Sequence, residues 1–219
     1  CAGIEHKMGI RGCVTCTMAF GENGGCTGYL LGGERQGMKI MFNMMNAFRM
    51  GTAIQAQGVS SAAMMHAVAY AKSRLQGSSL EDMNNPAAPM APIISHPDIA
   101  RTILGIKAHV DAQRLLIYYM FHQIDLASIL EGEGAREAQA LLELLVPVCK
   151  AGCSDMNVFV TSEAMQVFGG YGFCSDYPIE QMMRNSKILA IFEGANGIQG
   201  IDLVMRKIIM NPGQYNYSV

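Results

Sequence analysis

Three short blocks in the C-terminal third of the sequence decide how the fold is interpreted: QVFGGYGF at residues 166–173, YPIE at residues 177–180 and IFEGANGIQ at residues 191–199. Together they predict a helix that ends at paired glycines, a loop, a short helix that begins near Pro178, and an acidic residue, Glu193, on the following turn. Glycine beyond a helix end and proline at a helix start follow the known preferences of these two residues. The blocks therefore predict a helical protein in which one turn presents a carboxylate.

Glu193 follows the apolar run of residues 188–192 and precedes Gly194. A carboxylate in this setting loses part of its hydration, which makes it a stronger base near neutral pH. The alternative is an ordinary surface acid at the end of a helix. The spacing by itself favours this alternative, because perturbed acids are a minority even in clefts. The residue pattern leaves both interpretations open.

Composition and charge exclude several classes of protein. The 219 residues are enough for one sizeable domain, or for one domain and part of another. Half of them are hydrophobic and 16% are charged, which favours a substantial core over disorder. The net charge is −2 without a Lys/Arg block, so we expect no nucleic-acid partner. No apolar run reaches membrane-spanning length and no leader begins the chain, so we expect no membrane association.

The seven cysteines are irregularly spaced, which indicates free, mostly buried thiols in a reducing compartment and a cytoplasmic location. Cys13 and Cys16 have the spacing of half a zinc or redox site, but no second pair of ligands completes it, so we predict no metal. The eighteen methionines, several of them at helical spacing, are expected to fill the core.

Residues 1–33 are rich in glycine and contain short β-leaning segments, at residues 14–18 and 29–31 among others. This pattern predicts two or three strands with tight turns. So few strands are marginally stable alone, so we expect this region to be the remnant of a β-domain and the chain to begin inside that domain.

Residues 34–210 have helical periodicity and predict an antiparallel bundle of four or five helices, with a tail at residues 211–219. Methionines and Phe48 mark the apolar face of the first helix. Pro147 is expected to bend the third helix or to shift its start. The first two expected helices cover residues 37–74 and a segment from Pro97 to a turn at residues 131–134, with a long loop at residues 78–92 between them. The other three cover a segment from that turn to Gly169, residues 179–189 and residues 198–209.

The three C-terminal blocks resemble the signature of the acyl-CoA dehydrogenase family, in which FGGxGF, YPxE and (Y/F)EG...IQ motifs occur in this order and spacing. The resemblance extends over essentially the whole chain, because HKMGIRG at residues 6–12 is similar to the last strands of the family's central β-domain. His96-Pro97-Asp98 and NGIQ at residues 196–199 are most similar to the branch of 3-methylmercaptopropionyl-CoA dehydrogenases. The fold implied is a mainly α, antiparallel helical bundle of the family's C-terminal type, preceded by a few strands of a truncated β-domain.

The resemblance implies α,β-dehydrogenation of an acyl-CoA thioester in fatty acid metabolism. Glu193 is the implied base for the α-proton, while a hydride passes from the β-carbon to N5 of FAD. It also implies a homo-oligomer (a dimer or a tetramer), and an electron-transfer flavoprotein or oxygen as the acceptor. Two other functions remain open: a related fold used for binding, as in relatives associated with DNA repair, and a helical interaction domain that has lost its cofactor.

The resemblance also implies individual site residues. The FAD contacts implied are Arg74 and Gln76 at the pyrophosphate, His96 near the same cofactor, Gln166, Gly169 and Gly170 at the adenosine half, and Ala195 and Gly197 close to the flavin. The substrate contacts implied are Asn46 and Arg49 in the CoA and acyl channel, and Phe192 and Gly194 beside the acyl group.

Each of these residues also has an ordinary interpretation. Arg74 could interact with a helix dipole, Arg49 could lie on a solvated helix face, and the glycines could simply end a helix. Ala195, Gly197 and Phe192 depart from the Thr, Gln or Glu, and Tyr that are usual in the family. These departures leave substrate preference and flavin tuning open. We expect the Glu193 carboxylate to face the cleft shaped by the glycine pair and to point away from bulk solvent.

Overall fold

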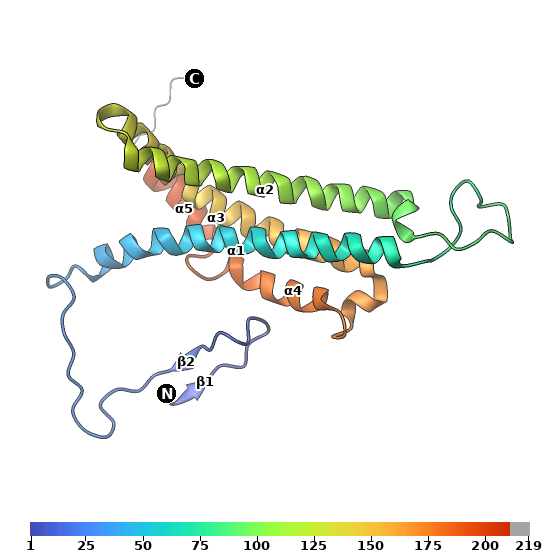
Figure 1. Cartoon of the computed structure of the whole chain (residues 1–219). Helices are drawn as coiled ribbons and strands as arrows, with labels where there is room; N and C mark the ends of the chain where they lie inside the picture. Colours follow the sequence, from blue (N-terminus) through green and yellow to red (C-terminus); the bar gives the residue numbers. More distant parts are fainter. Residues whose placement is uncertain (211–219) are drawn as a thin grey trace.

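The computed structural model describes residues 1–210 and contains five α-helices, which build a long bundle (Figure 1). The helices are α1 (Gly37–Ser73), α2 (Pro97–Ile129), α3 (Gly132–Phe168), α4 (Pro178–Ser186) and α5 (Asn196–Ile201). The shorter helical segments are η1 (Ile93–Ser95), η2 (Gly169–Phe173), η3 (Lys187–Ala190) and the π-helix η4 (Asp202–Ile209). The helices α1 to α4 run in alternating directions, so the prediction of a mainly α, antiparallel bundle is confirmed.

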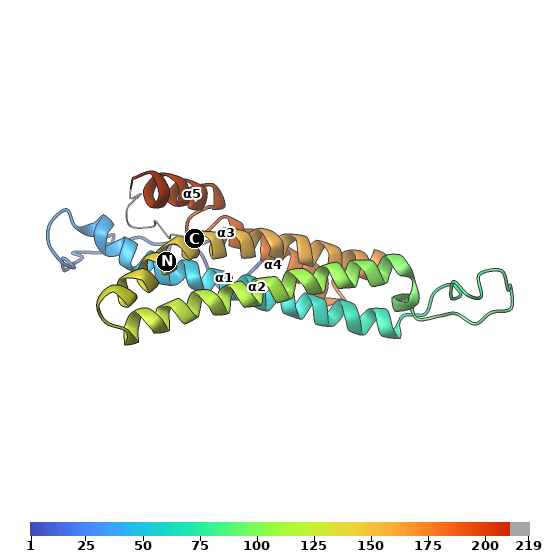
Figure 2. The ribbon, with the colours of Figure 1, turned by 90° about the horizontal axis from the view of Figure 1, so that it is seen from above.

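The central helix is α3, which packs against α1, α2, α4 and α5. Figure 2 shows α1, α2 and α3 side by side, with the loop between α1 and α2 extending beyond one end of the bundle. The buried side chains form two clusters along this axis. The first lies between α1, α2, α3 and α4 and includes Ala67, Val110, Val160 and Ile179. The second lies towards α5 and includes Ala53, Met120, Cys149 and Leu189.

The buried apolar side chains of α1 are alanines, not the predicted methionines. Ala53, Ala56, Ala63, Ala67 and Ala71 are completely buried. The expected apolar positions Met41, Met44 and Phe48 are exposed. Small side chains let helix backbones approach closely, so the face that meets the neighbouring helices has no room for long ones. The prediction that methionines fill the core is therefore wrong for most of them, although Met120 is completely buried.

Pro147 does not shift the start of α3, contrary to one of the two expected effects. The helix begins at Gly132, inside the predicted turn, and Pro147 lies within it. A proline inside a helix costs a hydrogen bond, about 3 kcal/mol in isolation. Pro147 is among the largest completely buried residues, so tight packing on its surroundings offsets this cost.

The N-terminal region contains one two-stranded antiparallel sheet, with β1 (Gly3–Ile4) paired to β2 (Cys16–Thr17). The β-leaning residues 29–31 are exposed and form no strand, because no neighbouring strand lies beside them in the described part of the chain. The HKMG segment packs on α4, where Arg184 Nη1 donates to the Met8 carbonyl at 2.7 Å. A Cβ on Gly9 would lie 2.7 Å from the Arg184 carbonyl oxygen, so only glycine allows this approach.

All seven cysteines are free, but the expectation that most are buried is wrong. Cys149 and Cys153 are buried in α3, whereas Cys1, Cys13 and Cys26 lie exposed in the N-terminal region. Burial raises the pKa of both α3 thiols to about 12, so these two are chemically inert near neutral pH.

No helix within residues 1–210 combines the length and the apolar character that a membrane crossing requires. In the same range, no group of three or more His, Cys, Asp or Glu side chains could hold a metal ion. The predicted tail, residues 211–219, lies outside the described residues, and the predicted domain limits at residues 33 and 210 stay a prediction.

Candidate functional site

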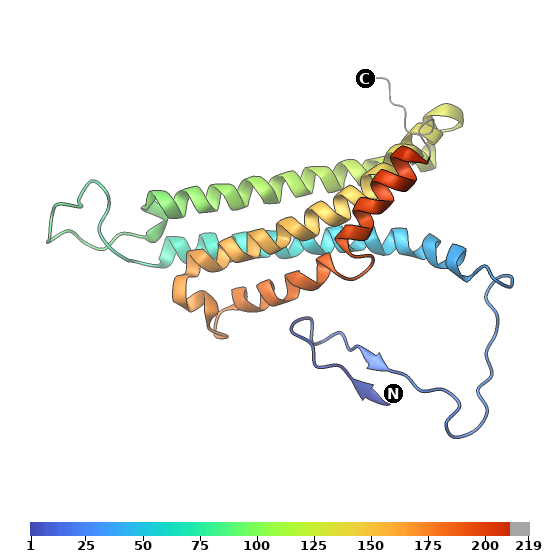
Figure 3. The same cartoon turned by 180° about the vertical axis from the view of Figure 1, so that it is seen from behind.

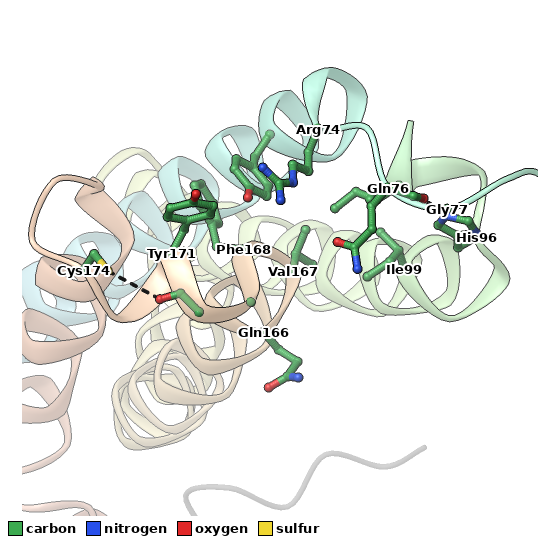
Figure 4. Close-up of a pocket in the computed structure, with 14 residues that line it drawn as sticks. Arg74, Gln76, Gly77, His96, Ile99, Gln166, Val167, Phe168, Tyr171 and Cys174 are labelled. Carbon is green, nitrogen blue, oxygen red and sulfur yellow. Dashed lines mark hydrogen bonds between the residues drawn. The ribbon is translucent and has the colours of Figure 1, made fainter. Parts of the chain in front are cut away.

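A cavity of about 780 Å³ lies where α1, the end of α3 and η1 meet at one end of the bundle (Figure 4). Its lining contains all six residues that the family resemblance assigns to the FAD pyrophosphate and adenosine: Arg74, Gln76, His96, Gln166, Gly169 and Gly170. These residues come from three segments that are distant in the sequence. The structure therefore brings together the set that the motifs implied.

Backbone pairing at the base of the long loop positions the first three of these residues. The Gln76 N–H donates to the Ala91 carbonyl at 3.0 Å, and the Ile93 N–H donates to the Arg74 carbonyl at 2.9 Å. His96 Nε2 lies 2.7 Å from the Gln76 carbonyl oxygen. A carbonyl can only accept, so this contact requires a proton on Nε2.

The glycine pair forms another part of the cavity wall. Gly169 ends α3 with φ of 60°, a conformation in which glycine is favoured. A Cβ on Gly170 would meet no atom within 4 Å, so its backbone borders open space. Gly172 differs, because a Cβ there would lie 2.6 Å from the Met165 carbonyl oxygen. The first two glycines leave room for a ligand, and the third allows close packing.

Aromatic rings support this end of the cavity. The Tyr70 and Phe168 rings stack with centroids 4.2 Å apart, and Tyr177 packs edge-on against both. The Arg74 guanidinium lies 5.3 Å from the centroid of the Tyr171 ring. Burial raises the pKa of the Tyr70 hydroxyl. The aromatic cluster gives Arg74 a fixed platform while its charge remains exposed.

Glu193 lies on a strained turn between η3 and α5. Its φ is 53° and that of Gly194 is 85°, so two successive residues have left-handed backbone. For a residue with a side chain this conformation costs about 1 kcal/mol, and such strain concentrates at functional sites. The side chain is half-buried.

Buried polar residues hold this turn from two sides. Gln199 Nε2 donates to the Gly194 carbonyl at 3.0 Å. Arg49 Nη1 forms an ion pair with Asp202 Oδ2 at 2.9 Å, and both side chains are buried. A Cβ on Gly194 would lie 2.5 Å from Gln199 Nε2 and 3.6 Å from Arg49 Nη2. Any side chain at this position would therefore push the turn away from its support.

Arg49 is thus not a solvated helix face, which was the ordinary interpretation of this residue. Asn46, one turn earlier on α1, is exposed, and Phe192 is half-buried before Glu193. Ala195 and Gly197 are exposed at the start of α5. The assignments of these residues and of Gly194 to substrate or flavin stay predictions.

The cavity and the Glu193 turn lie at different places along the bundle. Arg49 packs under the turn and Arg74 borders the cavity; a rise of about 1.5 Å per residue puts them roughly 37 Å apart along α1. The expectation that Glu193 faces the glycine-pair cleft is therefore wrong within one chain. The reason is that α4 and η3 run back along the bundle from the glycine pair to the turn (Figure 3).

A family model described as "Acyl-CoA dehydrogenase, C-terminal domain" matches residues 35–208. The chain belongs to the acyl-CoA dehydrogenase family. The oxidoreductase and flavoprotein character of the family, expected from the motifs, follows from this membership.

Two acyl-CoA dehydrogenases illustrate the similarity in sequence. A butyryl-CoA dehydrogenase from Syntrophomonas wolfei is 40% identical over 218 residues, which are 97% of this chain and 35% of the relative. A 3-methylmercaptopropionyl-CoA dehydrogenase from Ruegeria pomeroyi is 36% identical over 214 residues, which are 98% of this chain and 35% of the relative. The chain thus spans about a third of each relative, and the two names differ in their acyl group.

Solved structures show the same fold. Butyryl-CoA dehydrogenase from Megasphaera elsdenii matches with a TM-score of 0.66 and 28% identity, covering 92% of this chain and 46% of that chain. An acyl-CoA dehydrogenase from Bacillus anthracis, solved in complex with FAD, matches with a TM-score of 0.62 and 26% identity, covering 77% of this chain and 28% of that chain.

The cavity suits the diphosphate and adenosine of FAD, the family's cofactor. Its described lining carries a guanidinium, two amides and an imidazole but no carboxylate. A guanidinium matches phosphate oxygens in geometry and charge. The open space at Gly170 lets a ligand approach the backbone, and the volume falls in the usual range for ligand pockets, roughly 300–1,000 Å³.

The motifs assigned no role to several residues that the structure places at these sites. Tyr70 and Tyr171 support Arg74, and Gln199 and Asp202 support the Glu193 turn. Lys150 lies buried in α3, close enough to Glu193 to feel its charge. A weak signal existed for Lys150, since a lysine in the middle of an apolar helical pattern is rarely buried without a partner.

Proposed function

We propose that this helical domain serves an FAD-dependent acyl-CoA dehydrogenase in which Glu193 removes the α-proton of an acyl-CoA thioester. The observation that carries the proposal is the strained Glu193–Gly194 turn, held in place by the buried Arg49–Asp202 pair and by Gln199. A left-handed backbone at a glutamate costs free energy, and here buried groups keep that residue in position. A surface acid has no need of such a conformation, whereas a base must be positioned against one carbon atom of its substrate.

Glu193 would act as a general base through its half-buried carboxylate. Glutamate is a common general base, and a half-buried carboxylate can still reach a substrate. The fixed turn limits the positions that this carboxylate can adopt. FAD, when bound, would supply the acceptor for the hydride that leaves the β-carbon.

The cavity would hold the polar half of an FAD molecule. Arg74 and the side-chain amides of Gln76 and Gln166 would contact the pyrophosphate and adenosine, with the glycine pair allowing close approach. The roughly 37 Å between Arg49 and Arg74 exceeds the length of an extended FAD molecule. We therefore propose that the cavity serves the FAD of a second copy of the chain, which makes the functional unit a homo-oligomer. An electron-transfer flavoprotein is the proposed acceptor, on the family resemblance.

The test is flavin bleaching in the complete protein that contains this chain. Purified with FAD, it is mixed with a panel of acyl-CoA thioesters and the loss of flavin absorbance is followed. We expect rapid bleaching by at least one thioester, and a loss of at least about 1,000-fold in Glu193→Gln at unchanged FAD content, because the base is removed. Glu81→Gln, in the exposed loop, is the matched control and should bleach like the wild type.

If the flavin in Glu193→Gln bleached at the wild-type rate, the assignment of Glu193 as the base would be wrong. A yellow protein that ignored every thioester but bound DNA would instead favour the binding function left open by the sequence.

A further inference from the structure

A stripe of buried polar residues runs along α3 and has no part in the function proposed above. Lys150, Ser154, Asn157 and Thr161 are all completely buried, at spacings of four, three and four residues. Each bonds to another element: Lys150 and Ser154 to Asn196 at the start of α5, Asn157 to Ser60 of α1, and Thr161 to Ser186 of α4. Lys150 is the exceptional member, because burying an ammonium group costs several kcal/mol unless it is compensated.

The contacts of Lys150 lead directly to the Glu193 turn. Its Nζ donates to Asn196 Oδ1 at 2.9 Å. Asn196 Nδ2 in turn donates to Ser154 Oγ at 2.9 Å and to Asp155 Oδ1 at 2.7 Å. Asn196 lies three residues after Glu193, so these bonds clamp one end of the strained turn to the central helix.

The charges around Lys150 come from three elements. Asp155 on α3 and Glu193 in the turn attract the ammonium group, whereas Arg49 on α1 repels it. Arg49 is itself paired with Asp202 of η4. Burial is the largest influence and, together with Arg49, lowers the pKa of Lys150 to about 8. The lysine is therefore mostly charged at neutral pH and loses its charge under mildly alkaline conditions.

We infer that Lys150 is a positioning residue for Glu193: it fixes the turn through Asn196 and supplies a positive charge close to the carboxylate. The inference deepens the proposed function and rests on it. Asn196 is the mechanical link, because it accepts from Lys150 and donates to three residues of α3. The competing view is a lysine that only stabilises the fold.

The test compares variants of the complete FAD-loaded protein with butyryl-CoA as the probe, over about pH 6 to 9.5. Lys150→Met keeps the length of the side chain and removes the charge and the donor. Asn196→Ala breaks the link but leaves the charge. Lys107→Met, in an exposed pair with Asp111, is the matched control.

We expect the rate of flavin bleaching in Lys150→Met to fall by about 100-fold, as for a displaced catalytic group, with butyryl-CoA affinity almost unchanged. The rate of the wild type should fall above about pH 8, where Lys150 loses its charge, and this fall should be missing in Lys150→Met. Asn196→Ala should lose rate but keep the fall above about pH 8, and Lys107→Met should match the wild type.

The inference would be overturned if Lys150→Met kept the bleaching rate and the pH–rate profile of the wild type. A variant that lost only thermal stability would overturn it in the same way. If Lys150→Met did not fold, a wild-type rate in Asn196→Ala would overturn it instead. If the wild type itself were not bleached by any thioester, the proposed function would fail. The positioning link would then be decided by amide hydrogen exchange in residues 193–199: faster exchange in Lys150→Met than in Lys107→Met supports it, and equal exchange overturns it.

Discussion

The cavity at the end of α1 and the turn that carries Glu193 are built in opposite ways. The cavity is wide and is lined by exposed groups such as Arg74, Gln166 and Gly170, which leave room for a ligand. The turn is narrow, strained and supported by buried charges. A binding surface needs space and donors, whereas a base needs one fixed position, so the two regions should respond to mutation in different ways.

The largest expected effect is on stability at the turn. Asp202→Asn removes the negative charge opposite the buried guanidinium of Arg49, and the free energy of unfolding should fall by about 4 kcal/mol. Asp98→Asn, which breaks the exposed pair with Arg101, should cost less than about 1 kcal/mol. Urea denaturation of the two variants gives the comparison. Equal losses would show that the ion pair under the turn is not the buried support inferred above.

The glycines give a second contrast. Gly194→Ala places a Cβ 2.5 Å from Gln199 Nε2 at a φ of 85°, and should lower the free energy of unfolding by about 3 kcal/mol through crowding and a lost hydrogen bond. Gly170→Ala meets open space and should change stability by less than about 0.5 kcal/mol. It should weaken FAD binding instead, which a titration of the apoprotein with FAD measures. A stable Gly194→Ala variant would contradict the crowded geometry of the turn.

Arg74→Ala tests the cavity by itself. Its guanidinium is exposed over the Tyr171 ring, so its removal should hardly change stability. Loss of a charged contact to phosphate should weaken FAD binding by about tenfold. Fluorescence titration with FAD measures this, with Arg101→Ala on α2 as the control. Unchanged affinity would mean that the cavity does not hold the pyrophosphate.

The smallest expected effect concerns α4, which connects the two regions. A hydrogen bond from Arg184 lowers the pKa of Glu180, whose ordinary value is 4.5. A lowered pKa stabilises the fold above the ordinary value, and this contribution is lost as pH falls through the folded pKa. Glu180→Gln should therefore be slightly less stable than the wild type at pH 7, and the difference should narrow below about pH 4.5. Parallel unfolding curves at the two pH values check this, and a difference independent of pH would contradict the assignment.

Much of the fold followed from local signals. The starts of α2 and α4 at Pro97 and Pro178, and the end of α3 before Gly169, lie where the residues predicted them. Such boundaries depend on the backbone preferences of one or two residues, which act the same way in any fold. The six cavity residues were also found from the motifs, because each lies in a segment whose residue pattern could be matched to a family.

The sequence by itself determined the family, the helical bundle and the identity of the acidic residue on the last turn. The tertiary structure alone decided which face of α1 is buried, how far Glu193 lies from the cavity, and that Lys150 is connected to the turn. These features depend on contacts between residues far apart in the chain, such as Arg49 and Asp202. Helical periodicity indicates that a face is buried but not which neighbour covers it, and a buried charge is tolerated only where a distant partner reaches it.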